Sequence, residues 1–300
     1  MPAIARVAVV LPSGSPPPER LEAGLAWLRG AGLEVVPPRP RTPGGPSYLA
    51  GDDALRAREL VEALRDSDVD AVWCGRGGVG ALRTLTAIDR AGLGAALGAR
   101  PEVPLIGLSD ATPLLLARVA RGGAAIHGPV GIQLPRMAPA TDAAMRAWLR
   151  APEALPTLEA PAHAARRGTR VEGEVVAGNL AMLAATTGTP EQPRLAGKLL
   201  LVEDIGEPDW RIDRFLAQLE RAGALEGLAG LGLGTFEGCT PEGGAEAVLM
   251  AWAERLDVPA LAGLPFGHGA DVMPLALGRR ALLDPAGGVL AQPAAARSLS

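Results

Sequence analysis

The chain has 300 residues, of which 48% are hydrophobic and 21% are charged, and its net charge is −4 at pH 7. This composition allows a sizeable core and argues against a disordered chain, while the negative charge argues against a partner bound through nucleic-acid phosphates. Aromatic residues make up only 3% of the chain, so platforms for stacking nucleic-acid bases are scarce.

The first half of the chain alternates short apolar runs with amphipathic segments. The apolar runs predict strands over residues 6–11, 33–36, 71–74 and 104–109. Between them, leucines recur at helical spacing, at positions 21, 25 and 28 and again at 55, 60 and 64. This alternation predicts a parallel sheet with helices on its faces.

Residues 150–173 break the pattern with three prolines and a basic pair, and we interpret residues 151–173 as a linker between two domains. The domains then cover residues 1–150 and 174–300. Beyond the linker, we expect strands over 199–204 and 231–236 and a helix over 210–222. The predicted fold is α/β, with an N-terminal parallel-sheet α/β domain and a C-terminal, β-rich α+β domain.

The segment PLIGLSDATPLLLAR, residues 104–118, carries a buried strand directly into a helix. Thr112 is a candidate N-cap, and Pro113 stands where the first helical residue is expected. Ser109 therefore falls at the carboxyl end of a parallel strand, where ligand crevices form, next to helix N–H groups that stabilise an oxyanion. On this segment alone, the simpler interpretation is favoured, in which Ser109 and Asp110 only cap the helix.

A second candidate segment is CGRGGVGALRTL, residues 74–85, which follows a predicted strand. Its glycines allow the backbone to approach a ligand closely and to expose N–H groups, as in an anion or oxyanion pocket. It lacks the Gly-Lys-Ser/Thr ending of a phosphate-binding P-loop. Taken alone, a plain tight turn is the simpler explanation.

A serine nucleophile needs a base, and the chain offers three histidines, His127, His163 and His268. His163 lies in the linker, and His127 lies at a predicted strand end. His268 lies in a glycine-rich loop, which could present its imidazole to a site on the other domain. Each histidine taken alone fits a structural role.

A carboxylate that orients the histidine would complete a catalytic triad. The apolar run LLLVEDIGEP ends in three acids, Glu203, Asp204 and Glu207. Because side chains alternate along a strand, Glu203 and Asp204 cannot both face the same histidine. Solvation or helix capping would equally explain all three acids.

In this order, these segments resemble the LD-carboxypeptidase family of serine peptidases, which also includes the microcin C immunity-type hydrolases. The resemblance extends over most of the chain. Its motifs are Pro12-Ser13-Gly14, Tyr48-Leu49-Ala50-Gly51, Asp66-Ser67-Asp68-Val69-Asp70-Ala71, Arg76-Gly77-Gly78, Gly107-Leu108-Ser109-Asp110, His127-Gly128-Pro129, Gly178-Asn179-Leu180, Gly188-Thr189-Pro190, Glu203-Asp204, Arg211-Ile212-Asp213-Arg214 and Gly263-Leu264-Pro265-Phe266-Gly267-His268.

The resemblance implies a catalytic triad that the single segments do not. It implies that Ser109 is the nucleophile, that His268 is the general base and then the general acid, and that Glu203 orients His268. It also implies an oxyanion hole that combines the N–H of Asp110 with an N–H of Gly77 or Gly78.

The resemblance leaves the substrate open between two small molecules. One is a murein tetrapeptide, cut between the L-centre of a diamino acid and the terminal D-Ala during cell-wall recycling. The other is an aminoacyl-nucleotide conjugate, as for a microcin C immunity-type amidase. The family commonly has Tyr after the Arg-Gly-Gly turn, where this chain has Val79, which bears on substrate preference. Arg76 and Asn179 are candidates to bind the substrate's free carboxylate.

A third possibility is a small-molecule binding protein that has lost catalytic turnover. A complete triad argues against this possibility, because a binding protein has no need of all three residues. The family fold, an α/β domain followed by a β-rich domain, usually forms a homodimer. We expect no cofactor and no metal, because the histidines are scattered and no zinc-binding spacing is present.

The cellular location is expected to be cytoplasmic. The N-terminus lacks the long apolar core of a signal peptide, and no apolar run is long enough to span a bilayer. The two cysteines, Cys74 and Cys239, do not make a disulfide framework, and both fit the role of small buried hydrophobes.

Overall fold

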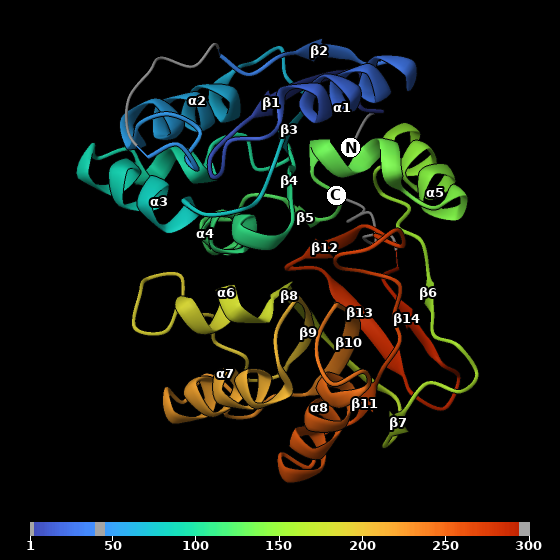
Figure 1. The fold of residues 1–300 in the computed structure, drawn as a ribbon. Coiled ribbons are helices and arrows are strands. Elements are labelled where there is room, and N and C mark those ends of the chain that lie inside the picture. The colour runs from blue at the N-terminus through green and yellow to red at the C-terminus, as the bar shows by residue number, and fades with distance from the viewer. Residues whose placement is uncertain (1–2, 40–45, 294–300) are drawn as a thin grey trace, which may run out of the picture.

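The computed structural model describes residues 3–39 and 46–293. Two sheets, each accompanied by helices, lie one above the other, with the N-terminal half in blue to green and the C-terminal half in yellow to red (Figure 1). The predicted α/β fold with two domains is confirmed. No helix in the described ranges is long and apolar enough to cross a membrane.

The first sheet has six strands in the order β12-β5-β4-β3-β1-β2. Five of them are parallel and come from the first half of the chain: β1 Arg6–Val10, β2 Glu34–Val36, β3 Ala71–Cys74, β4 Leu105–Gly107 and β5 Ala125–His127. The sixth, β12 Leu275–Leu277, comes from the second half and pairs antiparallel with β5. The second half of the chain therefore completes the first sheet.

Helices cover both faces of this sheet. One face packs against α1 Pro18–Gly30 and α5 Pro139–Arg150, and the other packs against α2 Asp53–Arg65, α3 Ala81–Arg90 and α4 Thr112–Ala120. Short 3₁₀ helices follow or precede them: η1 Gly94–Gly98, η2 Ser109–Ala111 and η3 Gly131–Arg136. A parallel sheet buried on both faces needs apolar residues at successive positions, and the four residues of β3 are all buried.

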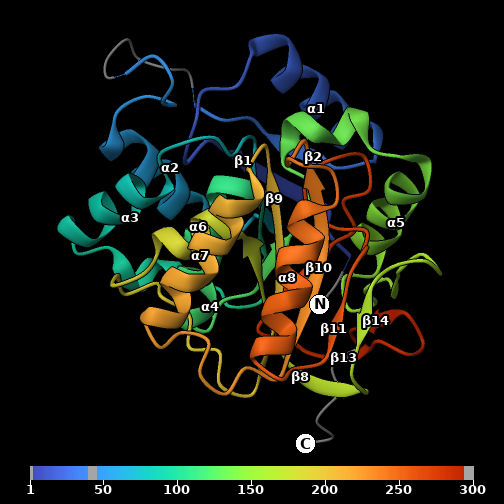
Figure 2. The same ribbon diagram turned by 60° about the horizontal axis from the view of Figure 1, so that its bottom comes forward.

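The second sheet has eight strands in the order β6-β14-β13-β8-β9-β10-β11-β7. Its parallel centre consists of β8 Val171–Asn179, β9 Lys198–Ile205, β10 Gly230–Glu237 and β11 Ala260–Leu261. Antiparallel strands flank this centre: β6 Leu158–Glu159, β7 Arg166–Arg167, β13 Arg280–Asp284 and β14 Val289–Ala291. The helices are α6 Leu180–Ala185, α7 Asp209–Arg221 and α8 Gly244–Arg255, of which α7 and α8 lie in front of β9 and β10 in Figure 2.

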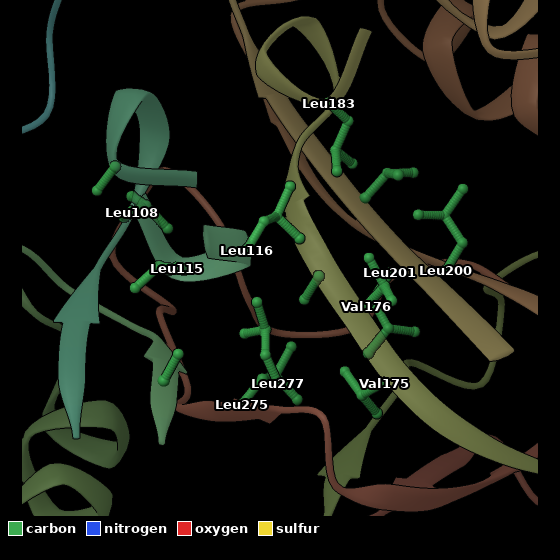
Figure 3. Close-up of a cluster of buried hydrophobic side chains, with 14 of the residues drawn as sticks. Leu108, Leu115, Leu116, Val175, Val176, Leu183, Leu200, Leu201, Leu275 and Leu277 are labelled. Atoms are coloured by element: carbon green, nitrogen blue, oxygen red, sulfur yellow. The ribbon is translucent and has the colours of Figure 1, made fainter. Parts of the chain in front are cut away.

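The two sheets share one apolar core. Leu116 of α4 lies between Leu115 on its own helix and Val176 of β8, and residues of β9 and β12 complete the cluster (Figure 3). Because this core is continuous, the relative placement of the two sheets is set by packing and not by the connecting segment.

The segment between the two halves differs from the expected irregular linker. Residues 151–173 contain the short strands β6 and β7, which pair at opposite edges of the second sheet, and β8 already begins at Val171. Much of this segment is thus part of the second sheet. Two-residue edge strands are too short to show a periodic pattern, so the prolines of this segment favoured a linker. The boundaries at 150 and 174 stay a proposal.

Candidate active site

Ser109 lies at the turn between β4 and α4, as the sequence predicts. Its backbone φ is +63°, in the left-handed region that side-chain-bearing residues rarely adopt. Thr112 is not the expected N-cap: it is the first residue of α4, and its Oγ1 donates to the carbonyl of Ser109 at 2.8 Å. The cap position is Ala111, which makes no side-chain hydrogen bond to the helix. The hydroxyl of Thr112 instead braces the turn that presents Ser109.

The glycine-rich loop after β3 lies directly against this turn. A Cβ on Gly77 would stand 2.8 Å from Cβ of Ser109 and 3.3 Å from the backbone nitrogen of Asp110. Only glycine permits this approach. The carbonyl of Gly77 accepts a hydrogen bond from the nitrogen of Gly14 at 3.0 Å, which anchors the loop to the segment that follows β1.

The side chain of Asp110 holds the far end of the same loop. Its buried carboxylate accepts a hydrogen bond from the nitrogen of Ala81 at 2.8 Å. Burial raises the pKa of Asp110 to about 6, against the lowering effect of that hydrogen bond.

A buried arginine supports the same loop. Arg56, fully buried, donates to the carbonyls of Pro12 and Gly80 at 3.2 and 3.0 Å. Arg56 was not predicted from the sequence, where its only signal is a charge among the apolar positions of α2.

Glu203, on β9 of the second sheet, meets His268 in the loop that follows β11. Oε2 of Glu203 lies 2.6 Å from Nδ1 of His268 and also accepts from the backbone nitrogen of His268 at 3.1 Å. Gly267 makes this possible, because a Cβ there would lie 2.6 Å from Cβ of Glu203, and its φ is +112°. Thr235 donates its hydroxyl to the carbonyl of His268, which fixes the loop.

The two groups shift each other's pKa. Burial alone raises the pKa of Glu203, but the imidazoles of His127 and His268 outweigh it and lower the pKa to about 2. Burial lowers the pKa of His268, but the hydrogen bond and charge of Glu203 outweigh it and raise the pKa above the ordinary value. Glu203 is therefore ionised, and it favours the imidazolium form of its partner.

Asp204 points away from this pair, as strand alternation predicts. Its carboxylate accepts from Nδ2 of Asn179 at 2.8 Å and from the nitrogen of Ala181 at 2.9 Å, and so steadies the start of α6. Asn179 is the N-cap of α6 and accepts from the nitrogen of Met182. Both ends of the Asn179 amide are thus engaged inside the fold. Asn179 does not line the cleft described next, so it is not placed to bind a substrate carboxylate.

Ser109 and His268 line one cleft of about 540 Å³ between the two halves of the chain. Arg76, Gly77 and Gly78 line it too, together with Arg20, Arg136 and Glu237. In the described part of the chain, no direct hydrogen bond joins the hydroxyl of Ser109 to the imidazole. A larger hollow of about 880 Å³ adjoins β10 and contains neither residue.

The other residues considered from the sequence do not contribute a reactive group to this cleft. His163 is exposed in the segment between the sheets. Burial raises the pKa of Cys74 to about 12, so this thiol is not a second nucleophile. Val79 is 57% exposed, next to Gly78. Among the described residues, no group of three or more His, Cys, Asp or Glu side chains could hold a metal ion.

His127 was expected to be structural, but in the structure it also lies close to Glu203. It is fully buried at the end of β5, and its Nε2 lies 3.8 Å from Oε1 of Glu203. No sequence pattern signals this contact, because the two residues lie on different sheets. The cleft thus brings together a serine, a glycine-rich loop and an imidazole that is backed by a buried carboxylate, the components of nucleophilic acyl transfer.

Comparison with known proteins agrees with this chemistry. Residues 7–128 match the model of the LD-carboxypeptidase N-terminal domain, and residues 172–283 match that of the LD-carboxypeptidase C-terminal domain. The murein tetrapeptide carboxypeptidase of Pseudomonas aeruginosa is 35% identical over 290 residues, which cover 93% of each chain.

Solved structures show the same fold. The muramoyltetrapeptide carboxypeptidase of Oxalobacter formigenes superposes with a TM-score of 0.81 at 29% identity, covering 96% of this chain and 100% of the other. The microcin C7 self immunity protein MccF superposes with a TM-score of 0.84 at 21% identity, covering 98% and 97%. At that identity the second likeness concerns the fold alone.

Proposed function

The chain belongs to the LD-carboxypeptidase family of serine peptidases, and we propose that it removes the terminal D-Ala of murein tetrapeptide in cell-wall recycling. The bond hydrolysed is the amide between the L-centre of the diamino acid and D-Ala. The observation that carries the proposal is the common cleft of Ser109, the Gly77–Gly78 loop and a His268 that is hydrogen-bonded to buried Glu203. The near full-length likeness to a murein tetrapeptide carboxypeptidase supports this substrate.

The reaction proceeds by acyl transfer through Ser109. Nε2 of His268 accepts the hydroxyl proton while Oγ attacks the carbonyl carbon of the amide. The N–H groups of Asp110 and of Gly77 or Gly78 stabilise the oxyanion. His268 then returns the proton to the leaving nitrogen, and D-Ala departs.

The second half-reaction regenerates the enzyme. A water molecule loses a proton to His268 and attacks the carbonyl carbon of the ester on Ser109. The ester bond breaks, His268 gives its proton to Oγ of Ser109, and the shortened peptide leaves. Oε2 of Glu203 lies 2.6 Å from Nδ1 of His268, so Nδ1 keeps its proton and Nε2 is left to act as the base.

The charge of the cleft suits a substrate with a free carboxylate. Three arginines, Arg20, Arg76 and Arg136, line the cleft together with a single acid, Glu237. Among the described residues none of the three arginines forms an ion pair, so their guanidinium groups remain available to an anion. Arg76, anchored to the carbonyl of Ser15 beside the glycine-rich loop, is our candidate for binding the carboxylate of D-Ala.

We also propose that the protein acts in the cytoplasm, in keeping with a role in cell-wall recycling, and that it forms a homodimer, as the family resemblance implies. Cell fractionation and light scattering of the purified protein test these two statements separately. Recovery outside the cytoplasmic fraction contradicts the first, and a monomeric mass at micromolar concentration contradicts the second.

The substrate is tested by offering the protein each candidate in turn. The purified protein is incubated with murein tetrapeptide and, separately, with an aminoacyl sulfamoyl adenosine, and products are detected by mass spectrometry. We expect free D-Ala and the matching tripeptide from the first and no hydrolysis of the second. Hydrolysis of only the aminoacyl conjugate would overturn the proposed substrate and favour a microcin C immunity-type amidase.

A further inference from the structure

Glu203 presents only one of its two oxygens to His268. Oε2 receives both the ring and the backbone N–H of His268, whereas Oε1 has no hydrogen-bond partner in the described part of the chain. Glu203 is fully buried, so bulk solvent does not reach Oε1. A buried carboxylate oxygen without a donor is costly, and such groups in native proteins are nearly always paired.

His127 faces this oxygen from the other sheet. Its Nε2 lies 3.8 Å from Oε1, and within the described residues neither ring nitrogen of His127 has a hydrogen-bond partner. An approach of about 1 Å brings the two atoms into hydrogen-bond range. A donor and an acceptor, both buried and both otherwise unsatisfied, therefore stand opposite each other.

The surroundings of His127 hold its ring in this orientation. In the first sheet His127 pairs with Gly107 of β4 on one side and with Leu275 of β12 on the other. The ring of Phe266 meets the imidazole edge-on, with centroids 5.7 Å apart and an interplanar angle of 81°. Gly107 precedes Ser109 by two residues, so His127 is fixed to the strand that carries the nucleophile.

We propose that His127 is a positioning residue, whose Nε2–H donates to Oε1 of Glu203 and fixes the carboxylate that orients His268. The carboxylate is then held from both ends, by His127 on Oε1 and by His268 on Oε2. This contact also sets the sheet that carries Ser109 against the sheet that carries Glu203. The role rests on the proposed serine mechanism, but its first test needs no substrate.

The first test reads the tautomer of His127 in the unaltered protein. Long-range ¹H–¹⁵N spectra of the histidine-labelled enzyme show which ring nitrogen carries the proton. With only three histidines, each signal is assigned by one substitution at a time. We expect His127 to be protonated at Nε2 in the folded enzyme. A neutral His127 protonated only at Nδ1 overturns the proposal, whatever the substrate proves to be.

The second test removes the donor. His127→Leu takes away the N–H, His127→Gln keeps one, and the exposed His163→Gln serves as the control. Without its donor on Oε1, Glu203 attracts the proton of His268 more strongly. The NMR titration midpoint of His268, which also faces Asp204 and Glu237, should therefore rise in His127→Leu. It should stay near the wild-type value in His127→Gln and in the control.

Activity on murein tetrapeptide completes the test. We expect His127→Leu to lower kcat about 10–100-fold with little change in KM, the range found when residues that orient metal-binding side chains are replaced. His127→Gln should recover most of kcat. If folded His127→Leu keeps both kcat and the His268 midpoint, His127 is only a core residue. If the midpoint rises but even the wild type leaves tetrapeptide intact, the proposed substrate fails and the positioning role stands.

Discussion

Ser109 keeps a left-handed backbone conformation that costs a side-chain-bearing residue roughly 1–3 kcal/mol. Contacts on both sides impose it: Thr112 donates to its carbonyl, and Gly77 packs against its Cβ. Strained residues of this kind occur where surrounding structure over-determines them, often at catalytic sites. The turn thereby exposes the hydroxyl at the cleft.

The two adjacent acids Glu203 and Asp204 should differ sharply in their effect on catalysis. Glu203→Gln should lower kcat on the order of 10²–10⁴-fold, because the amide cannot hold the charged imidazole in the same way. Asp204→Asn should lose much less, since Asp204 binds Asn179 and the nitrogen of Ala181 instead. Both variants are assayed on tetrapeptide, with circular dichroism as the folding control. A folded Asp204→Asn that is the more damaged enzyme contradicts the assignment of Glu203.

The pH dependence should follow His268. Burial lowers the pKa of its imidazole, but the hydrogen bond and charge of Glu203 raise it above the ordinary 6.5. A general base must be neutral, so kcat/KM should rise with pH through a midpoint above 6.5. Glu203→Gln removes the main raising effect, so its acid limb should move to lower pH. A pH–rate profile in which the limb stays in place or moves upward in the variant argues against the pairing.

At the scale of elements, the active site depends on the contact between the glycine-rich loop and the nucleophile turn. Gly77→Ala places a methyl group 2.8 Å from Cβ of Ser109, so the loop or the turn must move. We expect a loss of roughly 1–3 kcal/mol in the free energy of unfolding and a kcat lower on the order of 10²-fold. Urea unfolding and steady-state assays measure both.

Gly30→Ala is the matched control for this substitution. Gly30 ends α1, and a Cβ there meets nothing within 4 Å. Its kcat should equal that of the wild type. If Gly77→Ala also keeps wild-type activity, the loop does not lie against the nucleophile in solution.

Several elements, and the opposite directions of the Glu203 and Asp204 side chains, were predictable from the sequence, each for a local reason. Buried parallel strands give unbroken apolar runs, so 71–74 was predicted with the bounds that β3 has. Pro113 marked the start of α4, although Thr112 proved to be helical and not its cap. Strand alternation predicts that Glu203 and Asp204 face opposite sides, and in the structure Glu203 contacts His268 whereas Asp204 contacts Asn179.

Other features depend on tertiary contacts and leave no local signal. β12 joins the first sheet from far along the chain, and β6 and β7 are too short to show a period. The buried links of Arg56 to the loop and of His127 to Glu203 join segments that are distant in sequence. The family resemblance implied the triad residues but not the contacts of Arg56 and His127 that hold them in place.

The molecule as a whole shares one core between its two sheets, and β12 of the second half pairs with β5 of the first. The proposed triad is likewise divided, with Ser109 on one side and Glu203 and His268 on the other. The cleft is therefore preorganised by packing between the two halves of the chain.

This shared core predicts cooperative unfolding. Tryptophans report on both halves, Trp73 and Trp148 in the first and Trp252 in the second. Urea transitions followed by tryptophan fluorescence and by far-ultraviolet circular dichroism should coincide, as for a two-state protein. Two resolved transitions would show that the halves unfold independently and that the shared core contributes little.

The most direct measurement of the central claim is the release of D-Ala from murein tetrapeptide by the wild type and by Ser109→Ala, compared at equal concentration. The side chain of Ser109 lines the cleft and not the core, so the variant should fold normally. We expect the wild type to release D-Ala and the variant to release none above background, with matching circular dichroism spectra. Release of D-Ala by the folded variant at the wild-type rate would contradict the assignment of Ser109 as the nucleophile.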